Sequence, residues 1–207
     1  MAKNTTGTKR SRKNELRAKA AQKRRRQSMM LWAGIAAVVV LIGGIFFFNY
    51  WSSRPVGEEV AFTSQGNIHI ADFSRTPIAY NSTPPTSGPH YETIARWDVY
   101  EETLPYERVL HNLEDGGVAI YYQCEDGCPD LVTQLADVVN PYIDQGRHVI
   151  MVPNAPDQLG SDGQPLHQDM GSQIALAAWQ RLDKFDELDP DRVRAFIERY
   201  EGIDHHQ

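Results

Sequence analysis

The fold depends on one central stretch, HNLEDGGVAIYYQC (residues 111–124), which is followed by Cys-Pro at 128–129. The polar first half of the stretch, with two glycines at 116–117, predicts a loop. The segment 118–122 is β-branched and aromatic, which favours a buried strand. The two cysteines therefore stand where a strand should turn into a helix, and any chemistry of the chain is expected here.

The residues that follow predict a strand–helix–strand unit. Apolar residues recur at helical spacing over 129–139, with Pro129 in the first turn, and Pro141 should end or kink this helix. A second apolar β segment spans 148–152. Together these elements predict a right-handed βαβ unit in which strands 118–122 and 148–152 are central.

Further elements complete a single compact domain of the α+β (or α/β) class with a small sheet. Short strands are expected at 60–62 and 68–70, around a turn, and alternation along the second strand predicts that His69 faces solvent. Residues 174–179 are apolar and favour a third strand, although their alanines would also suit a helix.

The C-terminal segment predicts an amphipathic helix. Asp189 is placed as the N-cap, Pro190 as the first helical residue and Gly202 as the stop. The apolar positions between them share one helical face: Val193, Phe196, Ile197 and Tyr200. This helix is expected to pack on the sheet.

The charge distribution predicts a membrane helix near the N-terminus. Residues 1–28 hold 11 of the 21 Lys and Arg and one acid, so they carry +10. The remaining residues carry −16, and the sum is the net charge of −6. Residues 27–53 contain no charged side chain. A single-pass helix over 29–51 would be long enough for about 30 Å of hydrocarbon.

The positive-inside rule then predicts the orientation at the cell membrane. The basic tail 1–28 would be cytoplasmic, 52–59 would be a tether, and 60–203 would form the extracytoplasmic domain. A cleaved signal peptide is disfavoured by the long basic region and the missing small-x-small site. The tail is better suited to anionic lipid than to nucleic acid, so the bilayer is the expected partner. The sequence does not identify a protein partner.

A proline-rich segment, residues 76–90, precedes the central stretch. Its four prolines, with Gly and Ser, exclude a helix or a central strand and predict a rigid extended loop. Such a loop would either present His90 at a fixed position or simply pack over the edge of the domain.

Several motifs resemble a bacterial membrane-anchored family known as domain of unknown function 3105 (DUF3105). They are PPTSGPH at 84–90, Trp97, HNLExGG at 111–117 and IALxAW at 174–179. The resemblance covers about residues 60–203. It implies one extracytoplasmic α+β domain behind a signal anchor, and it implies no activity. Family members usually look like His-Asn-Leu-Glu-His-Gly, whereas here Asp115 takes the position of the second histidine.

A metal site is predicted on His90 and His111, with Glu114 and Asp115 as carboxylate ligands. Imidazole with carboxylate suits zinc or copper, and nearby thiolates would favour zinc or copper(I). His111 and Asp115 would share a helix face only if this segment were helical, and the glycines favour a turn. The alternative is that these polar side chains only hydrogen-bond neighbouring backbone.

The cysteine pair has three interpretations. Outside the cytoplasm, Cys124 and Cys128 could close a structural disulfide across the turn. The pair could instead exchange disulfides, because Cys128 near a helix N-terminus would have a stabilised thiolate. Its Cys-x3-Cys-Pro form is also similar to that of copper chaperones of cytochrome oxidase assembly, which implies copper delivery.

The sequence contains no complete catalytic signature, so no catalytic residue is assigned. Ser87 with His90 or His111 as base lacks the strand–turn–helix elbow that exposes a nucleophilic serine. Two classes of function remain. The first is a metal- or redox-active envelope protein, and the second is a disulfide-stapled binding or structural module.

Overall fold

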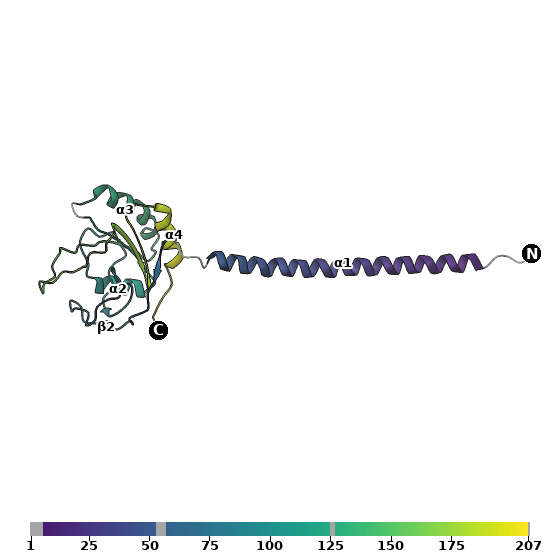
Figure 1. Cartoon of the computed structure of the whole chain (residues 1–207), viewed down its shortest axis with the longest axis horizontal. Coiled ribbons are helices and arrows are strands. Elements are labelled where there is room, and N and C mark those ends of the chain that lie inside the picture. The colour runs from purple at the N-terminus through teal and green to yellow at the C-terminus, as the bar shows by residue number, and fades with distance from the viewer. Residues whose placement is uncertain (1–5, 53–56, 125–126, 207) are drawn as a thin grey trace, which may run out of the picture. The chain divides into compact units, whose positions relative to one another are not determined.

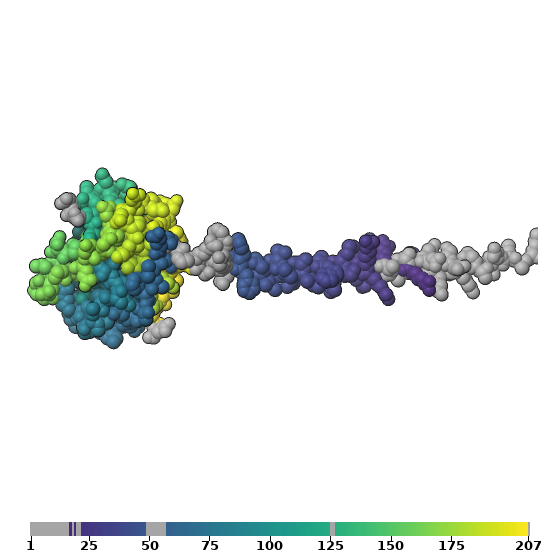
Figure 2. Space-filling model, viewed as in Figure 1, coloured from purple at the N-terminus to yellow at the C-terminus, as the bar shows by residue number. Residues whose placement is uncertain are grey.

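The computed structural model describes residues 6–52, 57–124 and 127–206. It divides into two compact units, residues 1–54 and 55–207. The first unit is a single helix, α1 (Thr6–Ser52), which continues from the apolar stretch into the basic tail (Figures 1 and 2). Within α1, Gln22–Phe48 is long and apolar enough to cross a membrane, as either an anchor or a signal sequence.

The second unit is built on a five-stranded mixed sheet with the order β1-β7-β6-β4-β5. Its strands are β1 (Val60–Ala61), β4 (Val118–Tyr122), β5 (Val149–Pro153), β6 (Ile174–Ala178) and β7 (Arg181–Phe185). The β4–β5 pair is parallel, and the other pairs are antiparallel. The expected strand at 118–122 is confirmed, and the strand expected at 174–179 is observed at 174–178.

Helix α3 (Pro129–Ile143) connects β4 to β5, as the strand–helix–strand pattern predicted. Two details differ from the prediction. Strand β5 lies at the sheet edge rather than in its centre, and residues 98–100 cover that edge through Tyr100 N to Met151 O (2.8 Å) and Met151 N to Asp98 O (3.0 Å). The helix also continues past Pro141 to Ile143, so the proline stands inside the last turn and does not end the helix.

Alternation along the buried strands supplies a core on each face of the sheet. On β4, Ala119 and Tyr121 pack with α2 (Tyr106–Glu114), whereas Val118 and Ile120 pack with α3 and α4 (Pro190–Tyr200). Figure 1 shows α3 and α4 together on one side of the sheet and α2 on the other. Both faces of β4 are therefore buried, which explains its continuous apolar sequence.

The terminal helix α4 begins and packs as predicted. The Asp189 side chain caps it by accepting from the backbone N–H groups of Asp191 (3.0 Å) and Arg192 (3.1 Å). Its apolar face is buried against the sheet through Val193, Phe196 and Ile197. After α4 the chain runs back toward the start of β4, where Gly202 N donates to Gly116 O at 2.8 Å.

Two segments differ from the sequence prediction. Helix α2 (106–114) extends into residues 111–117, where a loop was expected, because Val109, Leu110 and Leu113 share a helical face that is wholly buried. The expected strands at 60–62 and 68–70 belong to different sheets: β1 lies in the main sheet, and β2 (His69–Ile70) pairs in parallel with β3 (His90–Tyr91).

Candidate metal centre

Three separate parts of the domain bring histidine and carboxylate side chains together at the start of β4. These parts are the β2–β3 pair, the C-terminal end of α2 and the tail that follows α4. The residues that meet are His69, His90, His111, Glu114, Asp115 and His206. Four imidazoles and two carboxylates form this histidine cluster.

Secondary structure explains how the first members converge. In the parallel β2–β3 register His69 stands opposite His90, and the ring centroids are 4.9 Å apart. On α2, the spacing of His111, Glu114 and Asp115 places all three on one side of the helix end. The His69 ring stacks on His111 at 4.9 Å and so joins the strand pair to the helix.

The proline-rich segment fixes His90 in this arrangement. Residues 84–91 are buried, and the segment is held by Gly88 N to Gly66 O (2.9 Å) and His90 N to Ile68 O (3.0 Å). Ser87 Oγ accepts from the backbone N–H of Gln65 at 3.0 Å, so Ser87 has a structural contact. The loop presents a fully buried His90, as one of the two interpretations predicted.

The ligand atoms of the histidine cluster lie in two overlapping sets. Those of His69, His90 and His111 are all within 4.8 Å of one another. Those of His111, Asp115 and His206 satisfy the same limit. Glu114 touches both sets, because its Oε2 lies 2.9 Å from His90 Nε2, 3.4 Å from His69 Nε2 and 3.5 Å from His206 Nε2.

Both ring nitrogens of His90 face hydrogen-bond acceptors. Nδ1 lies 2.8 Å from Gly88 O, and Nε2 lies 2.9 Å from Glu114 Oε2. A neutral imidazole has only one N–H, so one of these contacts needs a further proton or a metal ion on the ring. Burial lowers the pKa of His90 and disfavours the extra proton, although Gly88 and Glu114 partly oppose this effect.

His111 and His206 have the same arrangement of partners. His111 Nδ1 lies 2.7 Å from Tyr91 O, and its Nε2 faces Asp115 Oδ1 at 3.8 Å. His206 Nδ1 lies 2.7 Å from Asp204 Oδ1, and its Nε2 faces Asp115 Oδ1 at 3.4 Å. In each ring Nδ1 is oriented by an acceptor and Nε2 points at a carboxylate, which is how metal-binding histidines are held.

Glu114 is the buried carboxylate at the centre, with 1% of its side chain exposed. Burial acts to raise its pKa, but Asn67, His90 and His206 outweigh this, and the net pKa is lowered. The Asn67 side chain interacts with the carboxylate and helps to lower its pKa, but Oε1 has no hydrogen-bond partner of regular geometry within the described residues.

The structure brings together all four residues predicted for the site: His90, His111, Glu114 and Asp115. It adds His69 and His206, which the sequence analysis did not include. His69 is exposed, as predicted, with 38% of its side chain accessible, and one side of its ring stacks on His111 in the histidine cluster. The sequence does place His206 beside another histidine near the chain end, but nothing in that pattern indicates where the tail folds.

The cysteines are not part of this cluster. Cys124 and Cys128 follow the far end of β4, and a five-residue strand is roughly 17 Å long. Their sulfur atoms are at disulfide distance, with Cα atoms 5.9 Å apart. The suggestion that these thiolates lie near the histidines is therefore wrong.

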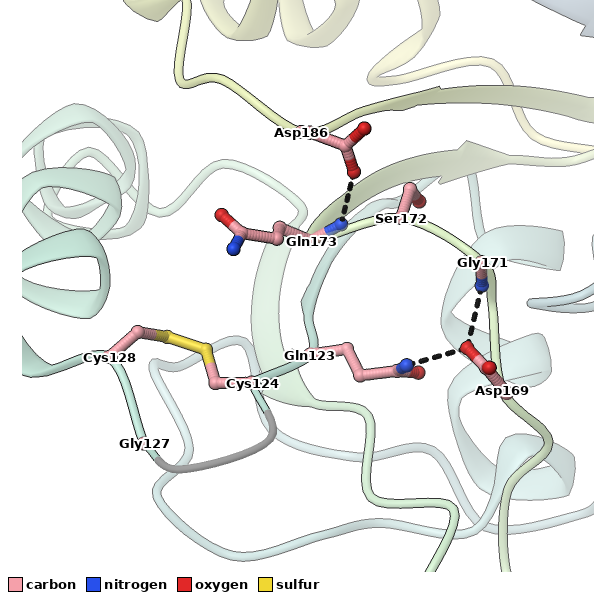
Figure 3. Close-up of a pocket in the computed structure, with 9 residues that line it drawn as sticks. All are labelled: Gln123, Cys124, Gly127, Cys128, Asp169, Gly171, Ser172, Gln173 and Asp186. Atoms are coloured by element: carbon pink, nitrogen blue, oxygen red, sulfur yellow. Dashed lines mark hydrogen bonds between the residues drawn. A yellow bond between two sulfur atoms is a disulfide. The ribbon is translucent and has the colours of Figure 1, made fainter.

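The disulfide lies at the edge of a cleft of about 460 Å³ (Figure 3). Polar groups line the opposite side, where Asp169 Oδ1 accepts from Gln123 Nε2 (2.6 Å) and from Gly171 N (2.8 Å). A second cleft also includes Cys124 and Cys128 in its wall. The pair is thus partly exposed and borders two clefts at the N-terminus of α3.

The fold and the site define an α+β domain, preceded by an apolar helix, that holds a histidine-rich candidate metal centre. The chain belongs to the family described as Protein of unknown function (DUF3105), whose model matches residues 72–206. The match includes five members of the histidine cluster, and His69 lies just before it. No curated protein and no solved structure matches the chain.

Proposed function

We propose that this chain binds a divalent transition metal, zinc or copper, in an extracytoplasmic domain that α1 holds at the cell membrane. The proposed ligands of this ion are His69, His90, His111 and Glu114. The observation that carries the proposal is that the Nε2 atoms of His90, His111 and His206 each face a carboxylate while each Nδ1 already faces an acceptor. Such rings are satisfied by a second proton or by a metal ion at Nε2, and burial disfavours the proton on His90.

The separations within the cluster favour a metal over protons. Two ligands at 2.0–2.1 Å from a tetrahedral ion are about 3.4 Å apart. The contacts of His69 and His206 with Glu114, at 3.4 and 3.5 Å, have this spacing and exceed the range of a normal hydrogen bond. Only His90 and Glu114, at 2.9 Å, are at hydrogen-bond distance.

The donor types indicate which metal fits. Imidazole nitrogens with carboxylate oxygens suit zinc, copper(II) and similar ions of intermediate softness. Copper(I) prefers thiolate or thioether, and the cysteines lie at the other end of β4. Asp115 in the place of a histidine keeps a ligand of this class, because aspartate oxygen also binds zinc.

The proposed location rests on charge and apolar length. The span Gln22–Phe48 is bounded on its N-terminal side by a strongly basic segment, which the positive-inside rule assigns to the cytoplasm. The basic tail would contact anionic lipid rather than nucleic acid. A reporter enzyme that is active only outside the cytoplasm, fused after residue 207, should be active; an expressed but inactive fusion would contradict the proposed location.

The metal proposal is tested by zinc titration of the full chain in detergent against a chromophoric chelator. The affinity tag should contain no histidine and should be at the N-terminus, away from His206. At least one zinc per chain should bind tightly, and His111→Ala should remove it without loss of secondary structure. His167→Gln, which changes a buried histidine outside the cluster, is the matched control. No tight zinc or copper in the wild type would overturn the proposal and leave a set of buried ion pairs.

Thiol–disulfide exchange is a second candidate function, because two clefts open onto the Cys124–Cys128 pair. An incoming thiolate would bond to one sulfur and release the other as a thiolate, and the N-terminus of α3 would stabilise that charge on Cys128. The double variant Cys124→Ser/Cys128→Ser separates this from a structural staple. If the disulfide is structural, the double variant should lose about 2 kcal/mol of unfolding free energy; if the pair exchanges disulfides, the loss should be much smaller.

A further inference from the structure

The C-terminal tail brings a second set of ligands to the histidine cluster. His206 Nε2 lies 3.4 Å from Asp115 Oδ1 and 3.5 Å from Glu114 Oε2. Both distances are close to the roughly 3.4 Å that separates two ligands of one tetrahedral ion. The His206 side chain is 45% exposed and that of Asp115 is 26% exposed, whereas His90 is wholly buried. Each set therefore has one exposed imidazole, His69 at 38% in the first and His206 at 45% in the second, and the second set also has the partly exposed Asp115.

His111 belongs to both sets but has one free nitrogen. Its Nδ1 must donate to Tyr91 O at 2.7 Å, so only Nε2 remains for a metal. One ion can take that nitrogen. A second ion would then rely on His206, Asp115 and an oxygen of Glu114.

Glu114 is suited to serve two ions at once. Its Oε2 already lies close to His69, His90 and His206, and its buried Oε1 has no regular hydrogen bond within the described residues. A carboxylate that lies between two sets of ligands can bridge two ions at the separation of about 3.5–4 Å found in two-metal sites.

The tail is held in place by backbone contacts with the loop that carries Asp115. Gly202 N donates to Gly116 O at 2.8 Å, and His205 N donates to Glu114 O at 2.9 Å. Gly116 has a φ of +78°, and a Cβ there would lie 2.9 Å from backbone atoms of Ile203. The close approach therefore requires glycine. Asp204 then orients the His206 ring through Nδ1 at 2.7 Å.

We propose that the histidine cluster holds two divalent ions bridged by Glu114, the second of them bound by His206 and Asp115. This inference rests on the proposed metal-binding function and adds a second position to it. The first ion would be bound by three imidazoles and Glu114. The second would have one imidazole and two carboxylates and, being exposed, would keep water ligands that other molecules can displace.

The test is the zinc content of the full chain in detergent, measured by elemental analysis after desalting from excess zinc. The wild type should retain two zinc ions per chain, and His206→Ala should retain one. Asp115→Asn should also retain one, which checks the carboxylate separately. The matched control is His205→Ala, since His205 lies in the same tail but stacks on Trp179, with centroids 6.1 Å apart; it should retain two.

The outcomes distinguish the two proposals. One zinc in the wild type, still lost in His111→Ala, would overturn the second position and leave the proposed function standing. Two zinc ions retained in His206→Ala, or only one retained in His205→Ala, would also overturn the second position. No zinc in the wild type would overturn both proposals.

Discussion

His90 and His167 are both buried in the same domain, yet their ring nitrogens have different hydrogen-bond partners. His167 accepts from Ala155 N on Nδ1 at 3.2 Å and donates from Nε2 to Leu104 O at 2.7 Å. That pairing satisfies a neutral imidazole completely. His90 faces an acceptor on each nitrogen, Gly88 O and the Glu114 carboxylate. The first histidine needs nothing more, whereas the second needs a cation.

The surroundings of the two rings agree with this difference. His167 stacks on Tyr106, with centroids 4.0 Å apart, and Tyr121 packs edge-on against it. Burial lowers the pKa of His167 to about 4, so it is neutral at pH 7. His90 instead meets other imidazoles and an ionised carboxylate. Burial alone therefore does not separate a core histidine from a ligand; the polarity of its two partners does.

The largest effect is expected from removing a ligand. His90→Ala or His111→Ala should weaken zinc binding at least 100-fold, because each deletes an imidazole from a four-ligand site. His167→Gln should leave the affinity unchanged, since it alters only the satisfied histidine. Competition with a chromophoric chelator measures both. Equal weakening in all three variants would show that they act through the fold.

Metal should also stabilise the domain through the same residues. Zinc at 100 times its dissociation constant should raise the unfolding free energy by about 2.7 kcal/mol, because it binds the folded state alone. Denaturant unfolding with and without chelator measures this. The rise should disappear in His111→Ala and persist in His167→Gln. A rise of equal size in both variants would contradict the assignment of the cluster as the site.

His167 should contribute a pH dependence to stability. In the unfolded chain its pKa returns to about 6.5, so between pH 7 and 5 the unfolded state binds more protons than the folded state. Lowering the pH over this range should therefore cost about 2 kcal/mol of unfolding free energy from this residue.

The contribution is measured as the difference between the wild type and His167→Gln, both unfolded with urea in chelator at pH 7 and pH 5. The glutamine amide can donate and accept like the neutral ring but does not titrate. The cluster histidines are the same in both proteins and cancel in the comparison. An identical pH dependence in the two proteins would show that His167 is not held neutral.

Part of the main sheet and the helices beside it could be predicted from local pattern, whereas strand β7 and the place of β5 at the sheet edge were not predicted. Strand β4, helix α3 and helix α4 were predicted near their observed positions. Helix α2 was not, although Val109, Leu110 and Leu113 have helical spacing, because the polar residues and glycines that follow suggested a loop. Because α2 was not predicted, the i, i+4 spacing of His111 and Asp115 was not expected to place both side chains on one side of a helix.

The remainder of the site depends on contacts distant in sequence. His69 reaches His90 only through the β2–β3 pair, whose two-residue strands are too short to predict. His206 reaches Asp115 only because the tail turns back along Gly116. The cysteines show the reverse: they are close to His111 in sequence, but an extended strand carries them away from it. Sequence proximity is thus a poor guide to which ligands meet.

The most direct measurement is a ¹⁵N NMR spectrum of the histidine side chains of the full chain in detergent, with and without zinc. The Nε2 signals of His90 and His111 should move to the position of metal-bound nitrogen, and Nδ1 of each should stay protonated. The His167 signals should not change. Cluster rings that remain doubly protonated when zinc is added, with no shift at Nε2, would contradict the account.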